Sequence, residues 1–358
     1  MPVCLNRELS NHSRWSANLG YADTGMKFRE NSAKCIDIGL LNNMPDGALQ
    51  STERQFLTLL NAAADGVLVR LSLYALPDVP RSDTGRCHIR NIYAGADSLV
   101  DSRLDGLIVT GTEPRTSNLR DEPYWASMTA VLDWAENHTH STVLSCLAAH
   151  AAVLHLDGVA RRRLNDKRFG LFECSPVSEH PLTVGVPSSV MMPHSRWNDL
   201  PEEHLSDCGY QVLMRSQEAG VDTFVKRKKS LMIFFQGHPE YEANTLLLEY
   251  RRDIGRYLRG ERDTYPAMPI GYFDSETLQA LSAAQERALS GRREQLLAEL
   301  PTTLAERNLP TVWHSASLPL YQNWLTYLSA QKEMRLKQRQ IPRAPAEDFG
   351  LRRRVAAG

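Results

Sequence analysis

Cys146 lies where an apolar, β-branched segment changes abruptly into a run of alanines and leucines. The segment before it, 141–145, is typical of a buried strand, and the segment after it, 147–154, has high helix propensity. A tight strand–turn–helix junction would expose the thiol at the carboxyl end of a sheet, with the amides of the helix start directed toward it. Such a place favours a thiolate nucleophile, although an isolated cysteine is more often a buried core residue.

A second apolar segment, 231–235, is followed closely by Gly-His-Pro-Glu, so that His238 and Glu240 lie two residues apart at another predicted strand end. A histidine can act as general base, and a neighbouring carboxylate can orient its imidazole. Together with the cysteine they form a set that can activate sulfur for acyl transfer. His150 is an alternative base, because it lies one helical turn after Cys146 on the same helix face.

Strands and helices alternate in the part of the sequence that precedes the cysteine. Strands are predicted at 36–41, 67–73 and 104–111, with a helix from 51 to 60 and another from 124 to 134. This order predicts an α/β fold, in which a parallel sheet is flanked by helices on both faces. The turns that follow the strands then meet at one edge of the sheet, where we expect the site.

The later part of the sequence predicts a hairpin and several helices. The lysine-rich turn at 226–229 separates two apolar strands, and the second of these leads to His238. A helix is predicted from 243 to 258, with Arg252 off its apolar stripe, and further amphipathic helices lie within 275–299 and 320–328.

We expect four regions along the chain. Residues 1–33 are predicted to be an extension without regular structure, and residues 34–273 the main domain. Residues 274–338 are predicted to form a helical C-terminal addition that packs on the core. Residues 339–358 are predicted to be a flexible tail.

Charge and composition narrow the class of protein. The chain has 41 Lys and Arg against 42 Asp and Glu, a net charge of −1, which gives no electrostatic reason to expect nucleic acid or an anionic membrane as partner. Short basic runs such as 161–163 are expected to be solvated or to hold the phosphates of a nucleotide-like cofactor. No signal peptide is visible, and no apolar run approaches the ~20 residues of a membrane span. The six cysteines lack metal-ligand spacing, so we expect no metal and a cytoplasmic protein.

Three parts of the sequence resemble the homoserine O-succinyltransferase family of methionine biosynthesis. They are the strand–helix junction at Cys146, the strand end that leads to His238 and Glu240, and the segment Pro193-His194-Ser195-Arg196. Other matching stretches run in the family's order over roughly residues 35 to 330; they are 40–45, 56–57, 105–111, 124–125 and 323–325. The resemblance implies the flavodoxin-like fold of class I glutamine amidotransferase domains, with helices added at the C-terminus. The main domain would then be an amidotransferase-like acyltransferase.

The resemblance also implies roles for individual residues. The acyl-thioester cysteine falls on Cys146, the general base on His238, and the carboxylate that orients the base on Glu240. The substrate-binding positions fall on Lys167, Ser195 and Arg252.

Two features of the sequence depart from the family's pattern. The segment from about 274 to 310 is longer than usual and adds helix. Arg115 falls where family members tend to carry Gly when they use succinyl-CoA and Glu when they use acetyl-CoA. A guanidinium there would attract the free carboxylate of a succinyl group and would offer an acetyl group nothing to pair with.

The reaction implied is transfer of an acyl group, succinyl in preference to acetyl, from acyl-CoA to the hydroxyl of L-homoserine. The acyl group would pass through a thioester on Cys146, and the tetrahedral oxyanion would be bound by the backbone amides of Leu147 and Asn43. Acyl-CoA is then a co-substrate, and no cofactor is bound permanently. The family precedent makes a homodimer the expected assembly.

Other readings of the same residues stay open. An amide hydrolase that acts on glutamine would use the same cysteine, histidine and glutamate. In such enzymes glycine is usual beside the nucleophilic cysteine, whereas Leu147 and Ala148 follow Cys146 in this sequence. A binding module would keep the fold and lose the chemistry. Serine could replace homoserine as acceptor, since one methylene gives only about 1–3 kcal/mol of discrimination.

Overall fold

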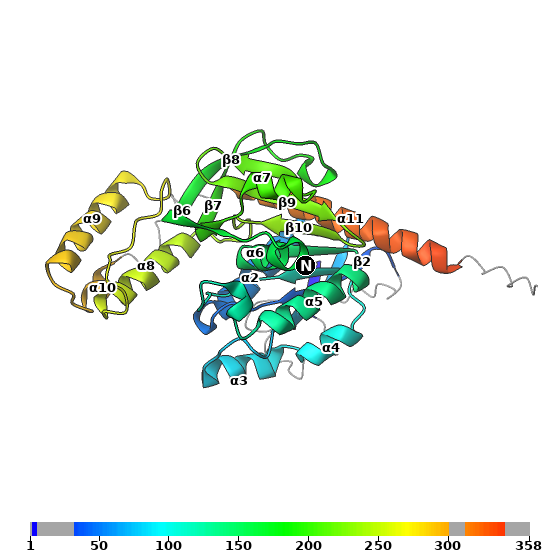
Figure 1. The fold of residues 1–358 in the computed structure, drawn as a ribbon, viewed down its shortest axis with the longest axis horizontal. Coiled ribbons are helices and arrows are strands. Elements are labelled where there is room, and N and C mark those ends of the chain that lie inside the picture. Colours follow the sequence, from blue (N-terminus) through cyan, green and yellow to red (C-terminus); the bar gives the residue numbers. More distant parts are fainter. Residues whose placement is uncertain (1, 6–31, 301–311, 341–358) are drawn as a thin grey trace, which may run out of the picture.

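The computed structural model describes residues 2–5, 32–300 and 312–340, which form a single sheet with helices on both faces (Figure 1). The ten strands are β1 (Val3–Leu5), β2 (Cys35–Leu41), β3 (Leu68–Tyr74), β4 (Gly106–Val109), β5 (Ser141–Ser145), β6 (Arg162–Pro176), β7 (Val190–Asp199), β8 (Gln211–Ser216), β9 (Gly220–Arg227) and β10 (Leu231–Phe235). The α-helices are α2 (Leu49–Ala63), α3 (Asp83–Ile92), α4 (Ala96–Asp101), α5 (Trp125–His138), α6 (Leu147–Asp157), α7 (Glu202–Asp207), α8 (Thr245–Leu258), α9 (Ser275–Ser290), α10 (Leu296–Glu299) and α11 (His314–Gln340).

The strand order is β1-β3-β2-β4-β5-β10-β9-β8-β6-β7. The strands from β1 to β10 in this order pair in parallel, and those from β10 to β7 pair in antiparallel fashion. The order β3-β2-β4-β5-β10 is that of a flavodoxin-like sheet. The predicted α/β class with a largely parallel sheet is therefore confirmed. In such a sheet the loops after β2 and β4 diverge, and a crevice opens between them.

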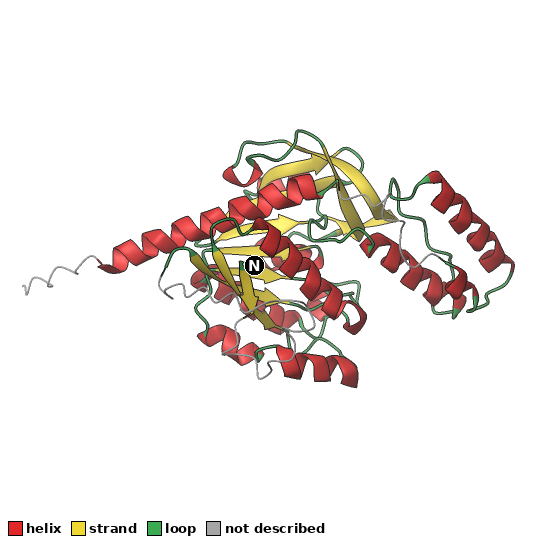
Figure 2. Cartoon of the chain, turned by 180° about the vertical axis from the view of Figure 1, so that it is seen from behind, coloured by secondary structure: helices red, strands yellow, loops and turns green. Residues whose placement is uncertain are grey.

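Both faces of the sheet are buried, because alternate residues of each central strand point to opposite sides. In β10, Leu231, Ile233 and Phe235 pack in the cluster that includes α2, α8 and α11. Met232 and Phe234 pack in the cluster that includes α4, α5 and α6. Figure 2 shows the long helix α11 lying across one side of the strands.

Helix α11 is part of the core. A methyl group at Gly106 of β4 would lie 2.8 Å from Leu328 and 2.9 Å from Trp324, so helix and strand approach as closely as a glycine allows. Lys332 Nζ is buried and donates to Asp105 Oδ2 at 2.6 Å. Helices α9 and α10 lie instead at the other end of the molecule, where α10 contacts both α8 and α9 (Figure 1). The proposed division of the chain into regions stays a prediction.

Several elements differ from those expected. Residues 3–5, predicted to lack structure, form the edge strand β1, whose Val3 is aligned with Val69 of β3. Helices α3 and α4 were not predicted, because their short polar segments lack an apolar period. The helix expected over 275–299 is interrupted after Ser290, and residues 341–358 of the predicted tail lie outside the described residues.

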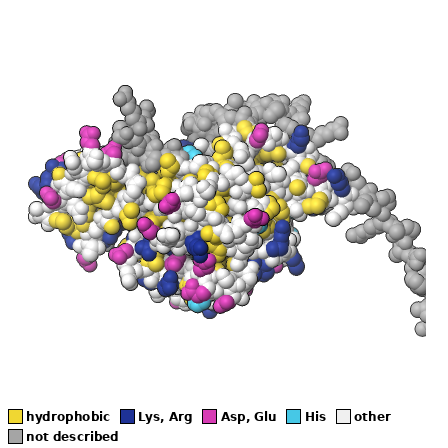
Figure 3. Space-filling model, turned by 90° about the horizontal axis from the view of Figure 1, so that it is seen from above, with side chains coloured by type: hydrophobic (Ala, Val, Ile, Leu, Met, Phe, Trp, Pro, Cys, Tyr) yellow, Lys and Arg dark blue, Asp and Glu magenta, His cyan; other side chains and the backbone are white. Residues whose placement is uncertain are grey.

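The surface is mixed in charge. Lysine, arginine and acidic side chains are interspersed over the face drawn in Figure 3. Among the described helices, none combines the length and the apolar composition that crossing a bilayer requires.

Candidate active site

Cys146 occupies the predicted junction between β5 and α6. Its backbone has φ of 50° and ψ of −108°, and among the described residues it is the one non-glycine residue with positive φ. Such a conformation is costly, and it occurs where a sharp strand-to-helix turn presents a nucleophile. The amide of Cys146 donates to the carbonyl of Phe235 at 2.7 Å, so pairing with β10 fixes the turn. Cys146 is partly exposed.

The loop after β10 brings His238 and Glu240 to this junction. His238 Nδ1 lies 2.9 Å from Glu240 Oε1, which also accepts a hydrogen bond from Ser145 Oγ at 3.2 Å. The imidazole also interacts electrostatically with Cys146, and the ring stacks on Tyr241 at 4.1 Å between centroids. The three candidate catalytic side chains therefore meet in one place.

The charges around His238 determine its protonation. Burial lowers the pKa of this imidazole, but the negative charges of Glu240 and of a thiolate at Cys146 outweigh burial and raise the pKa well above 6.5. The folded protein therefore favours the protonated form of His238. A positive charge next to sulfur favours the thiolate, which is the nucleophilic form.

His150, the alternative base, is directed elsewhere. Its Nε2 lies 2.9 Å from Gln236 Oε1, and the side chain is almost completely buried. Burial, assisted by the charge of Arg196, lowers the pKa of His150 to about 3. The geometry therefore favours His238 as the base that serves Cys146.

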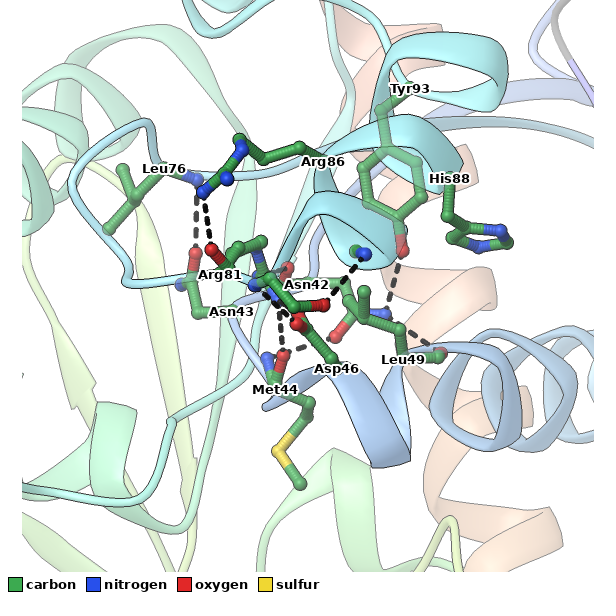
Figure 4. Close-up of polar contacts among 12 residues, drawn as sticks. Asn42, Asn43, Met44, Asp46, Leu49, Leu76, Arg81, Arg86, His88 and Tyr93 are labelled. Carbon is green, nitrogen blue, oxygen red and sulfur yellow. Dashed lines mark hydrogen bonds and ion pairs between the residues drawn. The ribbon is translucent and has the colours of Figure 1, made fainter.

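The two amides proposed for the oxyanion differ in their surroundings. Leu147 is the first residue of α6, and its amide donates to no acceptor among the described residues. The amide of Asn43 donates to Thr110 Oγ1 at 2.8 Å, and its side-chain oxygen accepts from the amide of Leu76 (Figure 4). The Asn43 amide is already paired in this structure, and its assignment to the oxyanion hole stays a prediction.

Gly111, directly after β4, offers a different second donor. Its amide makes no hydrogen bond within the described part of the chain. A methyl group at Gly111 would lie 2.4 Å from Leu147 Cβ and 3.1 Å from Leu147 N, so this glycine lies directly against the start of α6. The signal for Gly111 in the sequence was that the strand predicted at 104–111 ends at this glycine.

Gly111→Ala is expected to lower the rate of acylation by about 10²-fold, because the new methyl group displaces the Leu147 amide that would bind the oxyanion. The rate is measured by the appearance of the acyl-enzyme mass. Gly47→Ala is the matched control, since a methyl group there meets nothing within 4 Å. Equal rates for the two variants would contradict the prediction.

The loop after β2 is held by a residue that the sequence pattern did not single out. Arg81 donates to the carbonyl of Met44 at 2.8 Å and pairs with Asp46 at 3.2 Å, and its side chain is only 4% exposed (Figure 4). Asp46 in turn accepts from the amide of Ser82 at 2.7 Å. The loops after β2 and β3 are thus fixed to each other at the carboxyl edge of the sheet.

The predicted substrate-binding residues converge on Glu249 of α8. Ser195 Oγ of β7 donates to Glu249 Oε2 at 2.5 Å, and Lys167 Nζ of β6 lies 3.7 Å from the same oxygen. Arg252 lies 3.9 Å from this carboxylate. Tyr241, which stacks on His238, donates to Glu249 Oε1 at 2.5 Å and so connects this cluster to His238.

Asp253 completes the cluster. It lies 3.5 Å from Lys167 and 2.9 Å from Arg252 Nη2, whose side chain is 45% exposed. Glu249 and Asp253 were not predicted as site residues. Their spacing of four residues, on the helix that carries Arg252, puts both on one face and was the available signal.

A cavity of about 280 Å³ lies at the crevice between the loops after β2 and β4. It is lined by Pro45, Pro80, Thr112, Glu113, Pro114, Arg115, Tyr124 and Arg256. Glu113 accepts two hydrogen bonds of 2.8 Å from Arg256, which lower its pKa. The predicted specificity residue Arg115 thus borders a space large enough for part of an acyl donor.

One buried group in the described chain has side chains of the kinds that bind metals, namely Cys174, His194 and Asp222. His194 Nε2 lies 3.2 Å from Asp222 Oδ1, and burial raises the pKa of the Cys174 thiol. The absence of a metal site stays a prediction.

Comparisons with known proteins show the family to which the chain belongs. A family model described as homoserine O-succinyltransferase matches residues 2–335. The homoserine O-succinyltransferase of Methylorubrum extorquens is 47% identical over 305 residues, 85% of this chain and 91% of that protein. The one from Rhodopseudomonas palustris is 47% identical over 303 residues, with the same coverage. A glutamine amidotransferase structure from Methylobacillus flagellatus aligns over 84% of this chain and 94% of its own, at 13% identity and a TM-score of 0.42. From the family match and these two relatives, the chain belongs to the homoserine O-succinyltransferase family.

Proposed function

We propose that this protein transfers a succinyl group from succinyl-CoA to the hydroxyl of L-homoserine, through a thioester on Cys146. The observation that carries the proposal is the meeting of Cys146, His238 and Glu240 at the carboxyl edge of the sheet. The names of the relatives support homoserine and succinate as the substrate classes.

In the first half-reaction the Cys146 thiolate attacks the carbonyl carbon of acyl-CoA. The tetrahedral oxyanion accepts hydrogen bonds from the amide of Leu147 and from that of Gly111. The bond between carbon and the sulfur of CoA then breaks, and the His238 imidazolium gives its proton to the departing thiolate. The products are an acyl-cysteine, free CoA and a neutral histidine.

In the second half-reaction the neutral His238 takes the proton of the homoserine hydroxyl while the oxygen attacks the acyl-cysteine. The bond between carbon and Cys146 sulfur breaks, and the O-acyl ester leaves. Thiolate and imidazolium are restored, which returns the enzyme to its starting state. Glu240 holds the ring in one orientation and stabilises its positive charge. The cycle requires no bound cofactor.

Homoserine binds at the cluster around Glu249. The exposed guanidinium of Arg252 pairs with the amino acid carboxylate, since its fork matches two oxygens. Glu249 and Asp253 accept from the ammonium group, and Lys167 and Ser195 complete the pocket. Tyr241 fixes the position of this pocket relative to His238, because it donates to Glu249 and stacks on the imidazole.

Arg115 supports succinyl as the acyl group. Its side chain borders the cavity, and no ion pair involving it is found among the described residues. A cation there attracts a free carboxylate. A cytoplasmic location and a homodimer belong to the same proposal, and sedimentation of the purified protein tests the dimer.

The test of the proposed function is to incubate the protein with succinyl-CoA or acetyl-CoA and to weigh it intact. A succinyl adduct that disappears on addition of homoserine, with O-succinylhomoserine as product, is expected. Serine is offered in parallel as acceptor, and glutamine as a substrate for hydrolysis. Glutamine hydrolysis without either acyl adduct would overturn the proposal, and a preference for acetyl-CoA would overturn the choice of donor.

Arg252→Gln is expected to raise the KM for homoserine by about 10- to 100-fold, because a charge-assisted pair with the carboxylate is lost. Formation of the acyl-enzyme should be unchanged, since acyl-CoA does not use this residue. Steady-state kinetics and intact mass measure the two effects. The control is Arg259→Gln near the end of the same helix, where the arginine pairs with Glu261 at the surface. An equal loss in acylation would show that Arg252 acts on the whole site.

A further inference from the structure

Arg161 lies after α6, within one of the short basic runs, and the proposed reaction does not use it. Its Nη2 donates to the carbonyl of Ser117 at 3.1 Å, which attaches it to the loop between β4 and α5. Its Nη1 is buried and has no hydrogen-bond partner among the described residues. A buried guanidinium nitrogen without a partner is costly, so a ligand acceptor at this place would be bound strongly.

Tyr124 presents a second unused donor beside the same loop. Its ring lines the cavity at the crevice, and its hydroxyl is buried without a partner in the described chain. Burial, together with the charge of Glu122, raises the pKa of Tyr124, so that the hydroxyl stays protonated and able to donate.

Glu122 does not neutralise this arginine through an ion pair. Its Oε1 accepts from the amides of Arg115 at 2.6 Å and Thr116 at 2.7 Å, and from the Thr116 hydroxyl at 2.8 Å. No ion pair joins Glu122 to Arg161 in the part of the chain that the structure describes. Oε1 of Glu122 therefore shapes the loop, while its Oε2 is buried without a hydrogen-bond partner in the described chain and neither oxygen forms an ion pair with the guanidinium.

The charges around Arg161 act on its protonation in opposite directions. Burial lowers the pKa of Arg161, whereas the charges of Tyr124, Glu122 and Cys146 raise it. A second cation at the cavity, Arg115, is exposed at its rim.

We infer that Arg161 Nη1 and the Tyr124 hydroxyl bind the free carboxylate of the succinyl group carried by Cys146. This inference rests on the proposed function and identifies the residues that determine which acyl group the site accepts. A carboxylate is an acceptor that both donors can share, and the pair with guanidinium is charge-assisted. Arg115 then attracts the donor at the rim, while Arg161 distinguishes a dicarboxylic acyl group from a neutral one.

The test compares succinyl-CoA with butyryl-CoA, which has the same chain length and a methyl group in place of the carboxylate. Single-turnover acylation is followed by intact mass for the wild type, Arg161→Met and Tyr124→Phe. Arg161→Met should lower the ratio of succinyl to butyryl rates by about 10- to 100-fold, and Tyr124→Phe by about 2- to 10-fold. Arg161→Lys should restore part of the preference, because it keeps the charge.

Arg162→Gln is the matched control, since this neighbouring side chain is 61% exposed and pairs with Asp199. It should leave the ratio unchanged. Equal loss of both acyl groups in Arg161→Met would mean that the residue only holds the loop through Ser117, and would overturn the inference. If Arg161→Met does not fold, as judged by thermal unfolding, Tyr124→Phe decides by the same ratio. A wild type without any succinyl adduct would instead refute the proposed function.

Discussion

Replacing Cys146 with alanine is expected to abolish the acyl-enzyme and to lower kcat by at least about 10⁴-fold. The sulfur is the atom that would form the thioester, and the other groups of the site can only assist it. Without the sulfur, a neutral homoserine hydroxyl would have to attack acyl-CoA directly. Intact mass after incubation with succinyl-CoA measures the first effect, and steady-state formation of the ester measures the second.

The control for this variant is Cys87→Ser, which changes an exposed free cysteine away from the junction. It should keep both the adduct and the rate. Alanine keeps a Cβ at the strained φ of 50°, so the fold of the junction is preserved and thermal unfolding should change little. An acyl adduct that persists in Cys146→Ala would place the thioester on another residue and end the mechanism proposed for this site.

The elements that carry Cys146 and His238 could be predicted because their signals are local. The apolar segment before Cys146 and the hairpin before His238 each stand out within ten residues, and the structure has them as β5 and β10, aligned from Ser141 with Leu231 to Ser145 with Phe235. Two parallel neighbours that end at the same level bring their following loops together. The resemblance to the homoserine O-succinyltransferase family is confirmed by the family match and the relatives.

The features that could not be predicted depend on contacts between distant segments. The pairing of the Asn43 amide joins the loop after β2 to Thr110, 67 residues away, and no local pattern shows that the amide is occupied. Gly111 lies against Leu147 because β4 and β5 are adjacent. The carboxylate of Glu249 gathers groups from β6, β7 and α8. Periodicity places each element, but it does not say which polar groups already have partners.

Glu240→Gln is expected to lower kcat/KM for acyl-CoA by about 10² to 10⁴-fold and to move the basic limb of its pH profile to lower pH. Burial lowers the pKa of His238, and the charge of Glu240 is the largest of the effects that raise it. Removing that charge lowers the pKa. The imidazolium that must protonate the departing CoA is then lost at a lower pH than in the wild type.

Ser145→Ala separates charge from geometry in this prediction. It removes the 3.2 Å hydrogen bond to Glu240 Oε1 and leaves both the carboxylate and its 2.9 Å contact with His238. The basic limb of Ser145→Ala should therefore stay near that of the wild type, with a loss of about 10-fold or less. If Glu240→Gln slowed the enzyme without moving the limb, Glu240 would only orient the ring. If the limb moved to higher pH, the negative charge beside His238 could not be that of Glu240, and the ion pair between imidazolium and thiolate would need another origin.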